Sequence, residues 1–82
     1  MDIQAGSIVY SKAGRDKQKM FLVVGTENGY ALLADGVLRR VEKPKKKKFM
    51  HLQKTNMIAE FERETLTNAA VRKILVGFKP NN

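Results

Sequence analysis

The sequence predicts a mostly β protein in which five short strands form a small barrel and one short helix follows. Apolar runs rich in β-branched and aromatic residues alternate with turn residues over the first two thirds of the chain, as they do in small β domains. The last part instead repeats apolar residues at the three- and four-residue spacing of a helix. We therefore expect a barrel over residues 1–54 and a C-terminal extension over residues 55–82 that is not an independent domain.

The first two expected strands, Ile8–Tyr10 and Phe21–Val24, enclose a basic turn that is centred on glycine. Both runs are too short for a core helix, and their residue types favour strands. Gly14 can adopt a positive φ that a side chain would disfavour. The turn therefore presents exposed backbone together with the cations Lys12, Arg15, Lys17 and Lys19.

Two dipeptides predict hairpin turns and the strands after them. Asn28-Gly29 suits a two-residue type I′ turn because both residues accept a positive φ, and Tyr30–Ala34 should follow as the third strand. Asp35-Gly36 repeats this chemistry, so we expect a fourth strand over Val37–Val41.

A lysine-rich loop is expected next. Pro44 ends the fourth strand because proline lacks the amide that a sheet ladder needs. Four consecutive lysines follow over residues 45–48 and repel one another unless an anion neutralises them. Phe49–Leu52 should then form a short fifth strand.

The last part of the chain predicts one helix. Thr67 can cap it, and we place it over Asn68–Val76. Residues 57–61 suit either a strand or a helical turn, and both alternatives stay open. Residues 79–82 should fray. The apolar face of the helix consists of Ala70, Val71, Ile74, Leu75 and Phe78.

Composition restricts the function. The chain has 82 residues and a formal net charge of +8, which favours one domain with a polyanionic partner such as RNA, DNA or an anionic membrane. Of this charge, +7 lies before residue 55. The absence of cysteine excludes disulfides and thiolate metal sites. The lack of cysteine also fits a reducing cytoplasm. The N-terminus MDIQAGS has no basic region followed by an apolar stretch, and no run approaches the about 20 apolar residues that span a bilayer. We therefore expect a soluble, cytoplasmic protein and no membrane partner.

The cations of the turn, the fourth strand and the lysine loop are the candidate anion-binding residues. Lysine runs often serve only solubility, but two basic loops and two arginines in one small fold favour polyanion binding. The aromatic residues of the expected barrel are mostly needed for its core, and at most one of them, Tyr30 beside a turn, is a candidate to stack on a base. The candidate RNA-binding residues are Lys12, Gly14, Arg15, Lys17, Lys19, Arg39, Arg40, Lys43, Lys45, Lys46, Lys47 and Lys48.

Catalysis is not expected. His51 is the only histidine, and the chain offers no cysteine for it to activate and no phosphate-binding loop, so a structural role explains it better. Asp16, Asp35 and Glu42 are interpreted as turn or charge-balancing residues. We assign no catalytic residue, no metal ligand and no cofactor.

The stretch from Gly6 to Lys19 resembles the KOW motif of ribosomal large-subunit proteins and NusG-type elongation factors. Gln18 departs from the motif, which often has a second glycine there. Together with the later ADG and KPKKKK segments, residues 6–54 are similar to small bacterial KOW-domain RNA-binding proteins related to archaeal and eukaryotic ribosomal proteins. The resemblance implies an SH3-like barrel. The matching residues are Gly6, Val9, Gly14, Asp16, Lys17 and Lys19, with Arg15 in place of a lysine.

These observations predict a non-catalytic RNA-binding protein, associated with the ribosome or with translation, that grips structured RNA through basic loops. Phosphate contacts provide affinity with little sequence specificity. The resemblance leaves room for protein partners on the ribosome. Two alternatives stay open: a protein-interaction adaptor of the SH3-like type, which needs an exposed aromatic groove, and a module that uses the same charge to bind DNA or anionic lipid.

Overall fold

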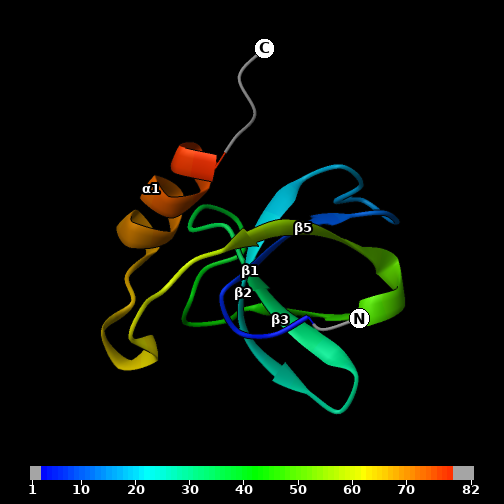
Figure 1. Ribbon diagram of the computed structural model, residues 1–82, viewed down its shortest axis with the longest axis horizontal. Coiled ribbons are helices and arrows are strands. Elements are labelled where there is room, and N and C mark those ends of the chain that lie inside the picture. Colours follow the sequence, from blue (N-terminus) through cyan, green and yellow to red (C-terminus); the bar gives the residue numbers. More distant parts are fainter. Residues whose placement is uncertain (1–2, 79–82) are drawn as a thin grey trace.

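The computed structural model describes residues 3–78 and confirms a mostly β protein with one C-terminal helix (Figure 1). Five antiparallel strands form one sheet in the order β4-β3-β2-β1-β5. Strands β4 and β5 each have one neighbour, so the sheet is open. The elements are β1 (Ser7–Ser11), β2 (Met20–Glu27), β3 (Tyr30–Ala34), β4 (Lys45–Lys48), the 3₁₀ helix η1 (Phe49–His51), β5 (Leu52–Ile58), the 3₁₀ helix η2 (Arg63–Thr65) and α1 (Asn68–Phe78).

The predictions for the first three strands are confirmed. β1 pairs with β2, and β2 pairs with β3. In the turn between β2 and β3, Asn28 and Gly29 have φ angles of 48° and 84°, the two positive values that a type I′ turn requires. Glu27 lies opposite Tyr30 across this turn, so the dipeptide sets the register of the hairpin.

The predicted fourth strand over Val37–Val41 is wrong, because this segment is a bent loop that Asp35 closes. The carboxylate oxygen Oδ1 of Asp35 accepts hydrogen bonds from the amides of Val37 at 2.8 Å and Arg39 at 2.9 Å. The amides of Asp35 and Gly36 donate in turn to the carbonyl oxygen of Arg39. Local bonding by an aspartate side chain thus replaces the sheet ladder.

The fourth strand is instead the lysine run, which we had predicted as a loop. Lys48 pairs opposite Tyr30 and Lys45 opposite Leu33. The predicted strand over Phe49–Leu52 is also wrong, since its first three residues form η1 and β5 begins only at Leu52. Lysines suit β4 because it is an edge strand, where their charge discourages pairing with a further strand.

The strands bury side chains on both faces of the sheet, as their two-residue period dictates. Val9, Phe21 and Leu33 belong to the apolar cluster on one face. Ile8 and Leu22 belong to the cluster on the other face, which α1 completes. The helix therefore covers the second face, beside β2 (Figure 1).

The predicted helix is confirmed as α1, which ends two residues later than expected. The amide of Ala70 donates to Oγ1 of Thr67 at 3.1 Å, so the threonine caps the helix as predicted. Asn68 adds a second tether at this end. Its Oδ1 accepts from the amide of Val41 at 2.8 Å, and its Nδ2 donates to the carboxylate of Glu42 at 2.9 Å. The loop after β3 is thereby fastened to the start of α1.

Residues 57–61, which suit either a strand or a helical turn by sequence, belong partly to β5 and partly to an irregular segment. β5 ends at Ile58, and residues 59–62 have no regular structure. The sheet therefore continues past residue 54, where we expected the barrel to end. The expected fraying of residues 79–82 lies outside the described residues. No helix within residues 3–78 is long and apolar enough to cross a membrane.

Candidate nucleic-acid interface

The turn between β1 and β2 contains two residues with left-handed backbone. Gly14 has a φ of 77°, as predicted, and Gln18 has a φ of 71° at the position where the KOW motif often has glycine. The amide of Gln18 donates to the carbonyl oxygen of Ser11 at 2.7 Å, and the amide of Ser11 donates to that of Lys19 at 3.0 Å. These bonds close the base of the turn, so residues 12–17 form a defined loop.

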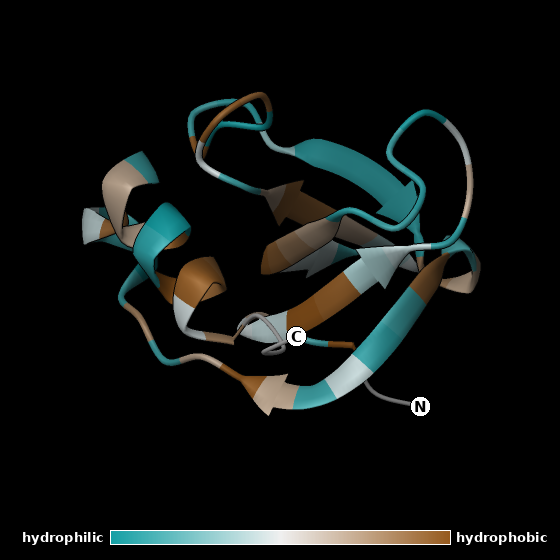
Figure 2. Cartoon of the chain, turned by 90° about the horizontal axis from the view of Figure 1, so that it is seen from above, coloured by the Kyte–Doolittle hydropathy of each residue, from teal (hydrophilic) through white to brown (hydrophobic). Residues whose placement is uncertain are grey.

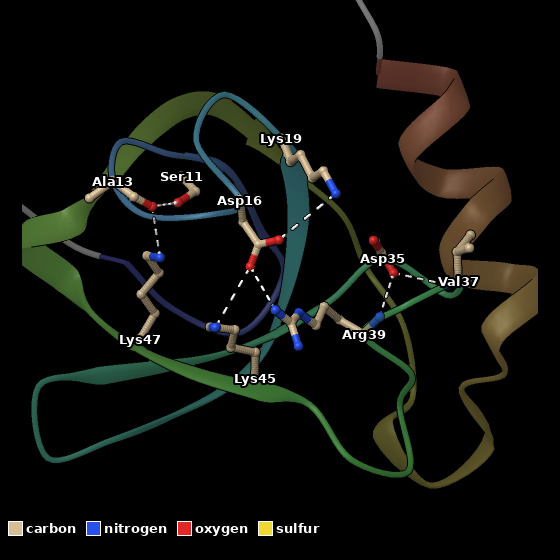
Figure 3. A network of polar contacts seen from close by, with 9 residues as sticks. All are labelled: Ser11, Ala13, Asp16, Lys19, Asp35, Val37, Arg39, Lys45 and Lys47. Atoms are coloured by element: carbon tan, nitrogen blue, oxygen red, sulfur yellow. Dashed lines mark hydrogen bonds and ion pairs between the residues drawn. The ribbon is translucent and has the colours of Figure 1, made fainter.

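Asp16 lies at the centre of the basic residues (Figure 3). Its side chain is only 4% exposed, and its carboxylate lies 3.0 Å from Nη2 of Arg39, 3.8 Å from Nζ of Lys45 and 3.9 Å from Nζ of Lys19. We call these four residues the Asp16 cluster. Its three cations come from the turn, from the loop after β3 and from β4, which are far apart in the sequence.

The neighbours of Asp16 keep its carboxylate charged. Burial by itself raises the pKa of the group, but the hydrogen bond and charge of Arg39, together with the charges of Lys45 and Lys19, hold the pKa of Asp16 below its ordinary value of 3.8. At neutral pH the cluster therefore consists of three cations and one anion. The cluster therefore carries a net charge of +2.

A second contact fastens β4 to the same turn. Nζ of Lys47 donates to the carbonyl oxygen of Ala13 at 3.0 Å (Figure 3), one residue before Gly14. Lys45 and Lys47 share one side of the strand, because side chains alternate along it. Both predicted basic segments, the turn and the lysine run, thus meet in the fold.

Lys46 and Lys48 occupy the other side of β4. Both are exposed, and Nζ of Lys46 lies 3.0 Å from the carboxylate of Glu27 and 5.6 Å from the ring centre of Tyr30. A lysine thus lies over one face of the tyrosine that we expected to stack on a base. The lysine run therefore supplies two different surfaces, of which only the one with Lys45 and Lys47 faces the turn.

The remaining candidate cations differ in their surroundings. Arg40 points to Glu42, with Nε 3.5 Å from its carboxylate, whereas its neighbour Arg39 points to Asp16. The two adjacent arginines therefore contact different acids. Within residues 3–78, no ion pair is formed by the exposed cations Lys12, Arg15, Lys17 and Lys43.

Asp35 and His51, to which we assign no catalytic role, both accept backbone hydrogen bonds. Asp35 closes its loop, in agreement with its interpretation as a turn residue. His51 is exposed, and its carbonyl oxygen accepts from the amide of Lys12 at 2.8 Å. In the part of the chain that the structure describes, no three His, Cys, Asp or Glu residues converge on a potential metal position.

Asp16 itself is missing from the binding residues that we chose from the sequence. We interpreted it as a turn or charge-balancing residue, and its burial under Arg39 was not predicted. The sequence feature that could have identified Asp16 as part of the site is its position as the one acid in a strongly basic turn. Two of its three partners, Arg39 and Lys45, are distant in the sequence, and no local pattern identifies contacts across such separations.

No protein-family model matches this chain, and no match was found among curated proteins.

Proposed function

We propose that the protein is a non-catalytic RNA-binding module of the KOW type, associated with the ribosome or with translation. The observation that supports this best is the Asp16 cluster, in which three separate segments bring cations within 3.0–3.9 Å of one carboxylate. Exposed lysines and an arginine extend the cluster along the turn. A concentrated cationic surface on a domain of net charge +8 suits a phosphate backbone.

The proposed fold type is an SH3-like barrel, as the KOW resemblance implies. Two irregularities support curling of the open sheet toward such a barrel. The pairing register shifts between Ser7 and Val9 on the β5 side of β1, and between Val23 and Gly25 in β2. Such bulges bend and twist the strands that carry them.

Asp16 prepares the surface for an anion. Long lysine and arginine side chains lose rotational freedom when they bind a phosphate, and the buried carboxylate holds Arg39 in place beforehand. The cluster keeps an excess of two positive charges, so one carboxylate limits repulsion without cancelling the attraction for phosphate. Lys12, Arg15 and Lys17 add charge at the rim of the turn.

The proposed ligand is structured RNA rather than a short sequence motif. The cations lie on a turn, a loop and an edge strand, and contacts of lysine with phosphate position a ligand without reading its bases. Tyr30 has a cation over one ring face, so base stacking contributes little to this proposal. The choice of RNA over DNA comes from the KOW resemblance.

The test is a salt titration with a ribosomal RNA fragment and a DNA duplex of equal length. We expect RNA to bind more tightly, with affinity falling steeply as salt rises, because phosphate contacts release condensed counterions. A slope near zero, or equal binding of both nucleic acids, contradicts the proposal.

A matched pair of variants locates the interface. The change Lys12→Ser with Lys17→Ser removes two exposed cations of the turn. The change Lys54→Ser with Lys73→Ser removes one half-buried cation from β5 and one exposed cation from α1. Both variants lose the same charge. Only the turn variant should reduce the slope of log affinity against log salt, by roughly 0.9 per lost phosphate contact. Equal reductions contradict a specific site at the turn.

A further inference from the structure

We propose a second interaction surface: an apolar groove between the loop after β3 and α1 that binds an amphipathic helix of another protein whose polar face is acidic. The groove is lined by Tyr10, Met20, Val37, Leu38, Leu75 and Val76, together with four polar or charged residues. Figure 2 shows the apolar stretch of this loop beside α1. The groove adjoins the RNA-binding turn at Lys19, whereas the other exposed cations of that turn, Lys12, Arg15 and Lys17, are not among its lining residues.

Exposed apolar side chains concentrate at this groove. Val37 is 59% exposed, Leu38 70% and Val76 69%. They are three of the five large apolar residues that are strongly exposed in the described chain; the other two, Met50 and Ile58, lie elsewhere. Scattered apolar residues on a surface need no explanation, but a contiguous group in a concave surface indicates a binding site.

The loop holds these side chains outward with a fixed backbone. The carboxylate of Asp35 accepts the amides of Val37 and Arg39, and Nη1 of Arg72 in α1 donates to the carbonyl oxygen of Gly36 at 2.7 Å. Gly36 packs so closely on the carbonyl of Asn68 that a Cβ atom would collide with it. The groove is therefore formed before a partner arrives, which lowers the entropic cost of binding.

The charges around the groove favour an acidic partner. Lys19 and Arg72 are among the lining residues. Asp35 is the one acid in the lining, so the two cations leave the lining with a net charge of +1. A second copy of this chain is disfavoured, because each copy carries a net charge of +8.

The shape and chemistry favour a helix over nucleic acid. Six of the ten lining residues are apolar, and four of these are aliphatic residues of a loop and a helix. Apolar grooves of this kind bind helices through apolar residues repeated every three or four positions. Bases instead stack on aromatic or arginine planes. The lining has one aromatic residue, Tyr10, and its arginine, Arg72, is hydrogen-bonded to the carbonyl oxygen of Gly36.

The test uses a synthetic helix of about 18 residues, long enough to form in isolation, with leucine on one face and glutamate on the other. A matched probe has lysine in place of glutamate. We expect the acidic probe to bind and to shift the amide resonances of residues 37, 38, 75 and 76. The basic probe should bind at least about tenfold more weakly. Shifts confined to the turn or to the lysine run overturn the proposal, because they show charge attraction alone.

Two matched pairs of variants distinguish the loss of the groove from a general loss of folding. We expect Leu38→Ser with Val76→Ser to weaken binding of the acidic probe about tenfold or more, whereas Met50→Ser with Ile58→Ser leaves it unchanged. Equal effects of the two pairs overturn the proposal, as does self-association of the free protein that Leu38→Ser with Val76→Ser abolishes. RNA binding by the Leu38 and Val76 variant should equal that of the parent, so the two proposals stand or fall separately.

Discussion

The carboxylate of Asp16 accepts a hydrogen bond of 3.0 Å from Nη2 of Arg39 and so joins the turn after β1 to the loop after β3. Nε of Arg39 is buried, and it has no hydrogen-bond partner within the described residues. The guanidinium group therefore depends on one carboxylate for its place in the fold. An arginine proposed to bind phosphate is in this way held by an acid that does not bind phosphate.

Replacing Asp16 by Asn should destabilise the protein by about 1–3 kcal/mol, because it leaves a partly buried guanidinium without its charged partner. Urea denaturation measures the change. Glu64→Gln is the control, since Glu64 is exposed and should change the free energy of unfolding by less than about 0.5 kcal/mol. Equal stability of the Asp16 variant and the parent would show that the cluster contributes nothing to the fold.

The lowered pKa of Asp16 predicts the pH dependence of this contribution. In the folded state the pKa lies below its ordinary value of 3.8, so the unfolded chain takes up the proton first as pH falls. The contribution is complete above the unfolded pKa and is lost as pH falls through the folded one. The difference in unfolding free energy between parent and Asp16→Asn should thus be constant near neutrality and shrink below about pH 4. A difference that persists unchanged to strong acid contradicts this assignment.

Replacing Gln18 by glycine should stabilise the protein. Its φ of 71° lies in the left-handed region, where a side chain costs about 1–2 kcal/mol, while glycine pays about 0.5–1 kcal/mol in chain entropy. We therefore expect Gln18→Gly to stabilise the protein by roughly 0.5–1 kcal/mol in urea denaturation. Gln53→Gly, at an exposed position in β5, should instead destabilise it. The interpretation of Gln18 fails if both variants lose stability.

The successful predictions rested on local chemistry. Asn28-Gly29 specifies its own turn geometry, and the apolar spacing after Thr67 specifies a helix, so neither depends on distant residues. The prediction of a strand over Val37–Val41 is wrong because Asp35-Gly36 suits a hairpin turn as well as it suits the closed loop that is found. Which of these two structures forms depends on the neighbouring elements. The edge of β3 accepts the lysine run as its partner, and Gly36 fits against the start of α1.

The same distinction applies to the candidate site. The basic residues can be recognised from the sequence by their type and clustering. Their arrangement cannot, because it depends on which strand follows β3. The pairing of β4 with β3 brings Lys45 to Asp16 and Lys47 to Ala13. Because the fourth strand was predicted at the wrong residues, the sequence did not predict that Asp16 lies at the centre of the basic residues.

The two sides of β4 should differ in their effect on RNA binding. The change Lys45→Ser with Lys47→Ser removes the side chains that contact Asp16 and Ala13. The change Lys46→Ser with Lys48→Ser removes the same charge from the opposite side of the strand. We expect the first variant to bind RNA more weakly, with its slope of log affinity against log salt reduced by up to roughly 0.9 per lysine. The second should reduce the slope less.

Stability provides the complementary measurement. The Lys45 and Lys47 variant loses contacts that fasten β4 to the turn, so urea denaturation should show a loss of roughly 1 kcal/mol. Lys46 makes an exposed ion pair with Glu27 and lies over the ring of Tyr30. Such exposed contacts contribute little, so the second variant should lose less stability than the first. If both variants lower RNA affinity and slope equally, RNA contacts both sides of the β4 edge rather than the turn side. If neither does, the lysine run serves solubility, and residues 12–19 remain the proposed RNA site.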